Sequence, residues 1–181
     1  IRVGFAGTLS VRKGFFDYCW LSNQLNSCAI EFFALGNSDS DTRTIIRMFQ
    51  PSFQPEPSLG KKQFLKTLAQ WDVLVLPSYE EGLSMVIPEA ITQQTIVIAS
   101  DVSGAKEYIN HGENGFIFKH GDRSELKAIL ERLANEPDLT IQIRSNIRDN
   151  LLKKNTKNDY IEQYNQSVES LTKTKGYHGK F

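Results

Sequence analysis

The chain has 181 residues, enough for one domain with a single hydrophobic core, and 40% of them are hydrophobic. Lysine plus arginine equals aspartate plus glutamate at 21 each, which excludes a global field that would favour nucleic acid or an anionic membrane surface. Any anion site must therefore be local. The sequence has no long apolar run and no signal-peptide pattern, so a soluble segment is predicted.

The chain opens on an apolar strand at residues 1–6, with no initiating methionine and no leader, and we expect it to be a piece of a longer protein. Short apolar runs then alternate with helical patterns, which predicts an α/β, Rossmann-like, doubly wound parallel sheet of about six strands. The clearest strands are expected at residues 1–6, 29–35, 73–76, 96–99 and 115–118. Helices are expected at residues 15–25, 44–49, 64–70, 85–92 and 105–110.

One further strand is expected near Ser52-Phe53, where Pro51 and Pro55 would restrict it to an edge of the sheet. Cys19 and Cys28 are expected to be core thiols of a reducing compartment.

Beyond Gly121 the pattern changes to helices alone, at residues 122–135, 138–152 and 157–172. Asp122 or Ser124 would cap the first of them, because both are good N-cap residues. The last helix would fold back across the domain. The predicted organisation is thus one domain at residues 1–172 with a tail at residues 173–181.

In an open parallel sheet, ligands bind outside the carboxyl ends of the strands. The loop Gly7–Gly14 follows the first strand and carries Arg12 and Lys13 close to a predicted helix start, where backbone amides also favour anions. Two cations there would suit a diphosphate. The loop has neither the Walker nor the dinucleotide glycine pattern. Considered without other evidence, Arg12 and Lys13 could equally be solvated charges of an ordinary loop.

A second loop follows the strand at residues 73–76. Gly82 permits a tight turn, Ser84 is a good cap residue, and Pro88 means that the next helix cannot begin much before Met85. The loop offers small residues and amides to a phosphate or a sugar hydroxyl. The loop at residues 101–107, after the following strand, would support this site or simply cap a helix.

Glu81 and Glu89, separated by seven residues, are the carboxylates of this segment. Glu81 would reach a ligand from the loop, and Glu89 would project from the helix toward the strand ends, where a ribose diol can be bound. The alternatives are a general acid/base pair, or surface charges with Glu89 as a helix-dipole partner.

These residues resemble the C-terminal, donor-binding domain of the retaining glycosyltransferases with the GT-B architecture, the glycosyl transferases of group 1. The resemblance runs from about Val3 to about Val168, and its strongest motif is Pro77-Ser78-x-x-Glu81-Gly82-Leu83-Ser84 with Glu89-Ala90. It implies one half of a GT-B fold. The supporting matches are Lys13-Gly14, Ala34-Leu35-Gly36, Trp71-Asp72-Val73, Ala99-Ser100-Asp101, Gly104 with Glu107, and His111-Gly112-Glu113-Asn114-Gly115.

The resemblance implies specific roles in donor binding. Lys13 would neutralise the diphosphate, Glu81 would contact the hydroxyls of the donor sugar, and Glu89 would hydrogen-bond the ribose. The family usually has an arginine at the position of Thr8. Either Arg12, the neighbouring cation, would replace that charge, or donor binding would be weaker. The donor-binding set implied is Gly7, Thr8, Gly82, Leu83, Ser84, Met85 and Glu89, with Lys13, Arg12 and Glu81 as the catalytic set.

The implied reaction moves a sugar from a UDP-sugar or GDP-sugar to an acceptor hydroxyl, with no metal and no cofactor, as in bacterial polysaccharide biosynthesis. The acceptor would be bound by an N-terminal domain that precedes this chain, so the chain alone would bind donor and transfer little. No nucleic acid partner is implied. The implied location is the cytoplasm, at the inner membrane face if the full-length protein associates with it.

Two other functions compete with this one. A non-catalytic nucleotide-sugar-binding module is favoured by Thr8, which departs from the family pattern. A GT-B-like sugar-nucleotide epimerase would need catalytic carboxylates and histidines from both domains, and the motif from Pro77 to Ser84 argues against it.

Overall fold

The structure is a computed structural model that describes residues 1–26, 29–82 and 84–155. Residues 1–147 form one compact unit, and a second unit begins at Arg148. The helix predicted at residues 157–172, the tail and Cys28 lie outside the described residues. The account that follows concerns the first unit, with α6 followed to its end.

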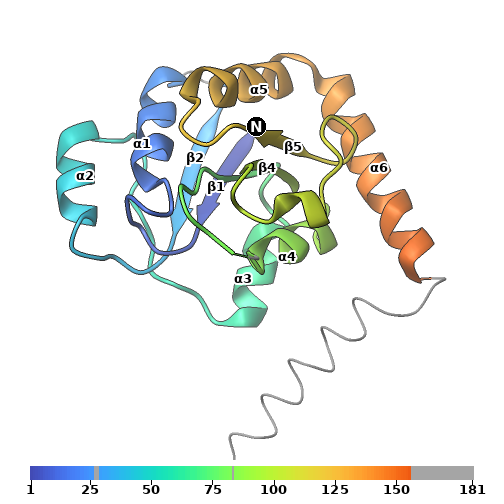
Figure 1. The fold of residues 1–181 in the computed structure, drawn as a ribbon, viewed down its shortest axis with the longest axis horizontal. Coiled ribbons are helices and arrows are strands. Elements are labelled where there is room, and N and C mark those ends of the chain that lie inside the picture. The colour runs from blue at the N-terminus through green and yellow to red at the C-terminus, as the bar shows by residue number, and fades with distance from the viewer. Residues whose placement is uncertain (27–28, 83, 156–181) are drawn as a thin grey trace, which may run out of the picture. The chain divides into compact units, whose positions relative to one another are not determined.

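The sheet has five parallel strands in the order β2-β1-β3-β4-β5 (Figure 1). Five of the expected strands are therefore confirmed, and the doubly wound parallel architecture with them. The strands are β1 (Arg2–Ala6), β2 (Glu31–Leu35), β3 (Val73–Leu76), β4 (Ile96–Ser100) and β5 (Phe116–Phe118).

The centre of the sheet is the point where the direction of winding reverses. The chain moves from β1 to β2 on one side, then returns to β3 on the other side of β1 and continues outward through β4 to β5. In the β1–β3 pair, Val3 lies opposite Val73 and Gly4 opposite Leu74. Loops that leave neighbouring strands in opposite directions open a crevice at their carboxyl ends.

Helices cover both faces of the sheet, with α1 packed against α5 and α3 packed against α4. No helix among the described residues is long and apolar enough to cross a membrane. The helices are α1 (Phe15–Gln24), α2 (Thr42–Phe49), α3 (Lys61–Leu68), α4 (Val86–Thr92), α5 (Arg123–Asn135) and α6 (Pro137–Asn155), and a short 3₁₀ turn, η1, spans Ala105–Glu107.

Alternate residues of β1 belong to the two halves of the core, because successive side chains of a strand point to opposite faces. Phe5 contacts the rings of Phe15 and Tyr18 from α1, with centroid distances of 5.4 and 5.3 Å. Gly4 points the other way and lies against the buried ring of Trp71. Strand β1 is thus packed on both faces, which fixes where its carboxyl end lies.

Buried polar groups of α1 support the same strand. The hydroxyl of Tyr18 lies 2.8 Å from the carbonyl oxygen of Val3 and 2.7 Å from that of Phe33, so it links α1 to both β1 and β2. Burial raises the pKa of Tyr18 well above its ordinary value. Cys19 beside it is a free, buried thiol, as expected, and burial raises its pKa to about 12.

The strand expected near Ser52-Phe53 does not form, and that prediction is wrong. Residues 50–60, all described, contain only an isolated bridge in which Glu56 pairs with Leu35. Proline has no N–H to donate, and Pro51, Pro55 and Pro57 remove the donors that a ladder needs. Phe53 is instead buried between helix and sheet, where its ring lies 5.4 Å from that of Tyr18.

Of two expectations about helix ends, the first is confirmed and the second is wrong. Asp122 is the N-cap of α5, and its carboxylate accepts a hydrogen bond from the amide of Glu125 at 2.9 Å, so Asp122 rather than Ser124 caps this helix. The helix expected at residues 105–110 shortens to η1, which follows Gly104 in a left-handed conformation, and Ser103 donates to the carbonyl of Ser100 instead of capping it.

The packing of Gly4 leads to a stability prediction. A Cβ atom at Gly4 would lie 2.0 Å from the Trp71 ring, so Gly4→Ala must displace a buried indole and is expected to lower the free energy of unfolding by about 1–3 kcal/mol. Urea denaturation measures this. Gly60→Ala is the matched control, because no atom lies within 4 Å of its Cβ position. Equal losses in the two variants would contradict the assignment.

Candidate functional site

The loop that follows β1 lies against the loop that follows β2. The amide of Gly7 donates to the carbonyl of Leu35 at 3.0 Å, and the amide of Leu9 donates to the carbonyl of Asn37 at the same distance. A Cβ atom at Gly36 would lie 1.6 Å from the carbonyl oxygen of Gly7, so only glycine allows this approach. The backbone of residues 7–8 is thereby held at the edge of the crevice, where both residues are exposed.

The same loop also lies against the segment after β3. Gly14 has φ of +75°, and a Cβ atom there would lie 1.9 Å from the carbonyl oxygen of Pro77. The amide of Tyr79 donates to the carbonyl of Arg12 at 2.9 Å. These two backbone contacts place Lys13 directly beside the segment that carries Glu81.

Lys13, Glu81 and Ser78 form one connected polar group. Lys13 and Glu81 make an ion pair through Oε1 of the carboxylate, with side chains 20% and 11% exposed. The buried Ser78 donates its hydroxyl to Oε2 of the same carboxylate at 2.8 Å. The carbonyl of Ser78 in turn accepts from the hydroxyl of Ser100 at 2.7 Å, so β4 supports the group from behind. Both carboxylate oxygens of Glu81 are thus held.

This group forms part of the wall of a pocket of about 230 Å³ at the carboxyl ends of β1 and β3. Five of the predicted site residues lie in it, and they come from two loops far apart in the sequence. The pocket is lined by Phe5, Ala6, Gly7, Thr8, Lys13, Leu76, Ser78, Glu81, Ser84 and Val86.

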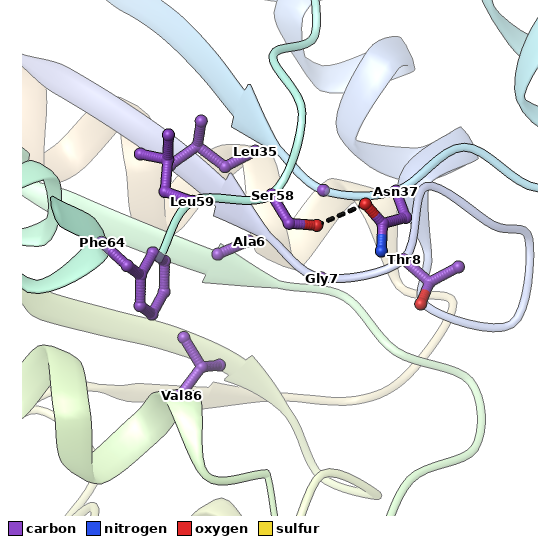
Figure 2. A pocket seen from close by; sticks show the side chains of 10 residues that line it. Ala6, Gly7, Thr8, Leu35, Asn37, Ser58, Leu59, Phe64 and Val86 are labelled. Atoms are coloured by element: carbon purple, nitrogen blue, oxygen red, sulfur yellow. Dashed lines mark hydrogen bonds between the residues drawn. The ribbon is translucent and has the colours of Figure 1, made fainter. Parts of the chain in front are cut away.

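A second pocket, of about 290 Å³, shares four lining residues with the first and extends toward β2 and α3. Figure 2 shows its apolar side chains, among them Phe64 from α3 and Val86 from α4, and a hydrogen bond from the hydroxyl of Ser58 to the side-chain oxygen of Asn37. This pocket could therefore pack apolar side chains against the faces of a planar group and hydrogen-bond its polar edges through Ser58 and Asn37. The shared residues are Ala6, Gly7, Thr8 and Val86.

Glu89 lies on α4 and lines neither pocket. It makes an ion pair with Lys61, the first residue of α3, and its side chain is 12% exposed whereas that of Lys61 is 44% exposed. The two carboxylates of the motif therefore each have a lysine partner. The lysine that pairs with Glu81 lies in the loop after β1, and the lysine that pairs with Glu89 lies in α3.

The other predicted residues lie around the rim. Arg12 is exposed and donates from its guanidinium to the backbone carbonyl of Glu80 at 3.3 Å, so it does not reach the pocket wall in this structure. Gly82 is exposed, Met85 is 40% exposed, and Leu83 lies outside the described residues.

Ser84 is buried in the pocket wall but does not cap α4 as its type suggests. The N-cap of α4 is Met85, and no side chain accepts a hydrogen bond there. The carbonyl of Ser84 instead accepts from the amide of Ile87 at 3.1 Å. The helix begins at Val86, as the position of Pro88 predicts.

Backbone amides contribute less to the first loop than its sequence suggests. The amide of Lys13 donates to the hydroxyl of Ser10 at 3.2 Å, and the amides of Gly14 and Phe15 donate to carbonyls within the loop. These donors are satisfied before any ligand arrives. The side-chain charge of Lys13 is what this part of the loop offers to an anion.

The model of the family described as glycosyl transferases group 1 matches residues 57–157, more than half of the 181 residues. The chain belongs to this family. The matched part includes the whole segment from Pro77 to Glu89, whereas the loop that carries Lys13 lies before it.

Curated relatives of this chain are glycosyltransferases. The capsular polysaccharide biosynthesis glycosyltransferase CapM of Staphylococcus aureus is 35% identical over 77 residues, which are 42% of this chain and 20% of CapM. The D-inositol 3-phosphate glycosyltransferase of Streptomyces scabiei is 32% identical over 83 residues, 46% of this chain and 19% of that protein. The matched part of the chain thus spans about a fifth of the length of these relatives.

Solved structures share the fold. The Anabaena protein HepE, in complex with UDP-glucose, superposes with a TM-score of 0.76 at 22% identity over 95% of this chain and 48% of HepE. The C-terminal domain of the group 1 glycosyl transferase LpcC from Francisella tularensis superposes with a TM-score of 0.72 at 18% identity, over 84% of this chain and 85% of that domain. The expected family and GT-B half-fold are confirmed, with five strands in place of about six.

A third pocket, of about 550 Å³, is polar and is lined by Tyr79 and residues 119–124. Its charged groups are largely paired: His120 lies 3.0 Å from Asp101, and Arg123 pairs with the buried Asp17. The hydrogen bonds from His120 hold the pKa of Asp101 below its usual range. Burial, and then the Asp17 carboxylate, raise the pKa of Tyr79.

No group of three or more metal-ligating side chains occurs among the described residues. Asp39-Ser40-Asp41 has the spacing of a metal pair, but Oδ1 of Asp39 accepts from the amides of Asp41 and Thr42 at 2.9 and 3.2 Å. It therefore organises the start of α2.

Four residues of the site were not predicted from the sequence as functional residues. Lys61 is a lysine in a helix with two others, and nothing in its local pattern marks it as the partner of Glu89. Asn37 and Ser58 come together only because the loops after β2 and before α3 meet at the second pocket. Ser78 stands in the motif, and its spacing of three residues from Glu81 was the available signal.

The connection between Ser78 and Glu81 can be tested in a double-mutant cycle with Ser78→Ala and Glu81→Ala. A hydroxyl bonded to a carboxylate in a part-buried site is expected to give a coupling energy of about 1–2 kcal/mol in urea unfolding. Ser22→Ala with Glu81→Ala is the control pair, because the buried Ser22 donates to a backbone carbonyl of α1. Additive losses in the Ser78 cycle would mean that the hydrogen bond does not hold Glu81.

Proposed function

We propose that this chain is the donor-binding domain of a retaining, metal-independent glycosyltransferase, which moves a sugar from a nucleotide diphosphate sugar to an acceptor hydroxyl. The observation that carries the proposal is the pocket at the β1–β3 crevice, where Lys13 and the Ser78-held Glu81 face the backbone of Gly7 and Thr8. It joins a larger pocket with apolar walls. A donor with a base, a diphosphate and a sugar has the same sequence of apolar, anionic and hydroxyl-rich parts.

Each of the two pockets binds a different part of this donor. The 290 Å³ pocket takes the nucleoside, with the base against Phe64 and Leu59 and its polar edge toward Asn37 and Ser58. The 230 Å³ pocket takes the diphosphate and the sugar. UDP-sugars and GDP-sugars both fit this division, and the complex of HepE with UDP-glucose favours the first.

Lys13 supplies the charge that the reaction needs. When the bond between sugar and diphosphate breaks, negative charge develops on the leaving phosphate, and a fixed ammonium group in a part-buried wall stabilises it without rearrangement of solvent. Arg12 is the second cation of the loop and replaces the charge that family members have at the position of Thr8. Arg12 donates to a backbone carbonyl at the exposed rim, and it belongs to the same loop as the phosphate site.

The remaining residues bind rather than react. Glu81 accepts hydrogen bonds from the sugar hydroxyls, and the segment of Gly82, Leu83, Ser84 and Met85 lies along the sugar and phosphate. Glu89 binds the ribose. The acceptor hydroxyl then attacks from the face that the diphosphate leaves, which retains the configuration of the sugar.

The acceptor is bound by the part of the full-length protein that precedes this domain. The chain alone therefore binds donor and transfers little. The full-length protein acts in the cytoplasm, in bacterial polysaccharide biosynthesis or a related pathway, and has no nucleic acid partner. Its contact with the inner membrane face would be made through the full-length enzyme.

A non-catalytic nucleotide-sugar-binding module is the second candidate, because Thr8 departs from the family pattern and Arg12 is not in the pocket wall. Such a module would bind the nucleotide through the same pockets. Arg12→Ala separates the two candidates in the full-length protein, where it should lower transfer but leave nucleoside binding intact.

Calorimetric titration with UDP, GDP and their sugars tests the proposal. Lys13→Ala and Glu89→Ala are each expected to weaken binding by about tenfold or more, because each removes a charged hydrogen-bonding group from the site. Lys66→Ala, an exposed lysine of α3, is the control and should bind like the parent. Absence of binding of either nucleotide at millimolar concentration would overturn the proposal, as would parental affinity in both site variants.

A further inference from the structure

Lys61 is placed beside the site by α3, although no sequence motif includes it. It is the first residue of α3, and its ammonium group pairs with Oε1 of Glu89 in the first turn of α4. The exposed fractions differ, at 44% for Lys61 and 12% for Glu89. The carboxylate is therefore largely enclosed while the lysine stem crosses from solvent to reach it.

The pair lies next to the pocket that takes the nucleoside. Phe64 is three residues after Lys61 on α3, and Val86 is three residues before Glu89 on α4, so each pair shares one side of its helix. Phe64 and Val86 both line the 290 Å³ pocket, and Figure 2 shows them pointing toward one another. The contact between Lys61 and Glu89 thus joins the two helices along the margin of this pocket.

We propose that Lys61 is a positioning residue that holds Glu89 for the ribose of the donor. This inference rests on the proposed function, since it assigns the ribose to Glu89. A glutamate side chain has several rotamers, and fixing one of them before the ligand arrives avoids an entropic cost on binding. A carboxylate oxygen can accept more than one hydrogen bond, so Glu89 can accept from the diol while Lys61 holds it.

Lys62 shows why the position matters. It is the next residue of the same helix and an exposed lysine, but among the described residues it makes no ion pair. Successive residues of a helix point about 100° apart, so only Lys61 is directed at α4. The two lysines have the same charge and nearly the same place in the chain, and Lys61 alone of the two makes the ion pair with Glu89.

The test compares UDP with 2′-deoxy-UDP, which lacks one hydroxyl of the diol. The 181-residue chain should bind UDP more tightly, and Glu89→Ala, which removes the acceptor, should bring the ratio of the two dissociation constants close to one. Lys61→Met is expected to lower this ratio by about threefold to fivefold, while Lys61→Arg restores it. Lys62→Met, the matched control, should leave the ratio unchanged. Urea unfolding of each variant confirms that it is folded.

The outcomes separate this inference from the proposed function. If UDP and GDP both fail to bind the parent chain, the proposed function fails and the inference fails with it. If UDP binds with a preference over 2′-deoxy-UDP that Glu89→Ala removes and Lys61→Met does not change, the proposed function stands and the positioning role is wrong. Equal weakening of both nucleotides by Lys61→Met would also overturn it, because that is the behaviour of a general cation.

Discussion

The close approach of two loops at the centre of the sheet is the constraint on which the site depends. Gly14 lies against the carbonyl of Pro77, and the amide of Tyr79 bonds to the carbonyl of Arg12. Both contacts are between backbones, so they fix the separation of the loops independently of side-chain rotamers. Lys13 and Glu81 meet because of this, although they are far apart in the sequence. The reversal of winding between β1 and β3 sets where it happens.

The two motif carboxylates, Glu81 and Glu89, differ in what holds them in place. Glu81 is held by Ser78, whose carbonyl is bonded to Ser100 of β4, so this carboxylate is supported by the central sheet itself. Glu89 is held by a lysine from a neighbouring helix whose side chain is partly in solvent. Under the proposed function, the group nearest the breaking bond has the firmer support, and the group that binds the ribose has the more adjustable one.

Much of the fold was predictable because its strands are short buried runs that are bounded by polar segments and rich in β-branched or aromatic residues. The strand expected at Ser52-Phe53 failed because prolines remove its donors, and Phe53 was free to pack against Tyr18 instead. In the site, Lys13, Glu81 and Glu89 were predictable because they stand in or near a recognisable motif. Lys61, Asn37 and Ser58 were not, because their contacts depend on how α3 and two loops meet in space.

The pairing of both motif carboxylates with lysines has a consequence for selectivity. The ion pairs Lys13–Glu81 and Lys61–Glu89 each sum to zero charge, so neither adds a net positive field to the pocket margin, where Arg12 is the exposed cation. A small free anion such as inorganic phosphate would have to replace Glu81 at Lys13 and so exchange one anionic contact for another. Under the proposed function, a nucleotide sugar also brings a base, a ribose and sugar hydroxyls, which compensate for that exchange. The two ion pairs therefore favour the whole donor over a free anion.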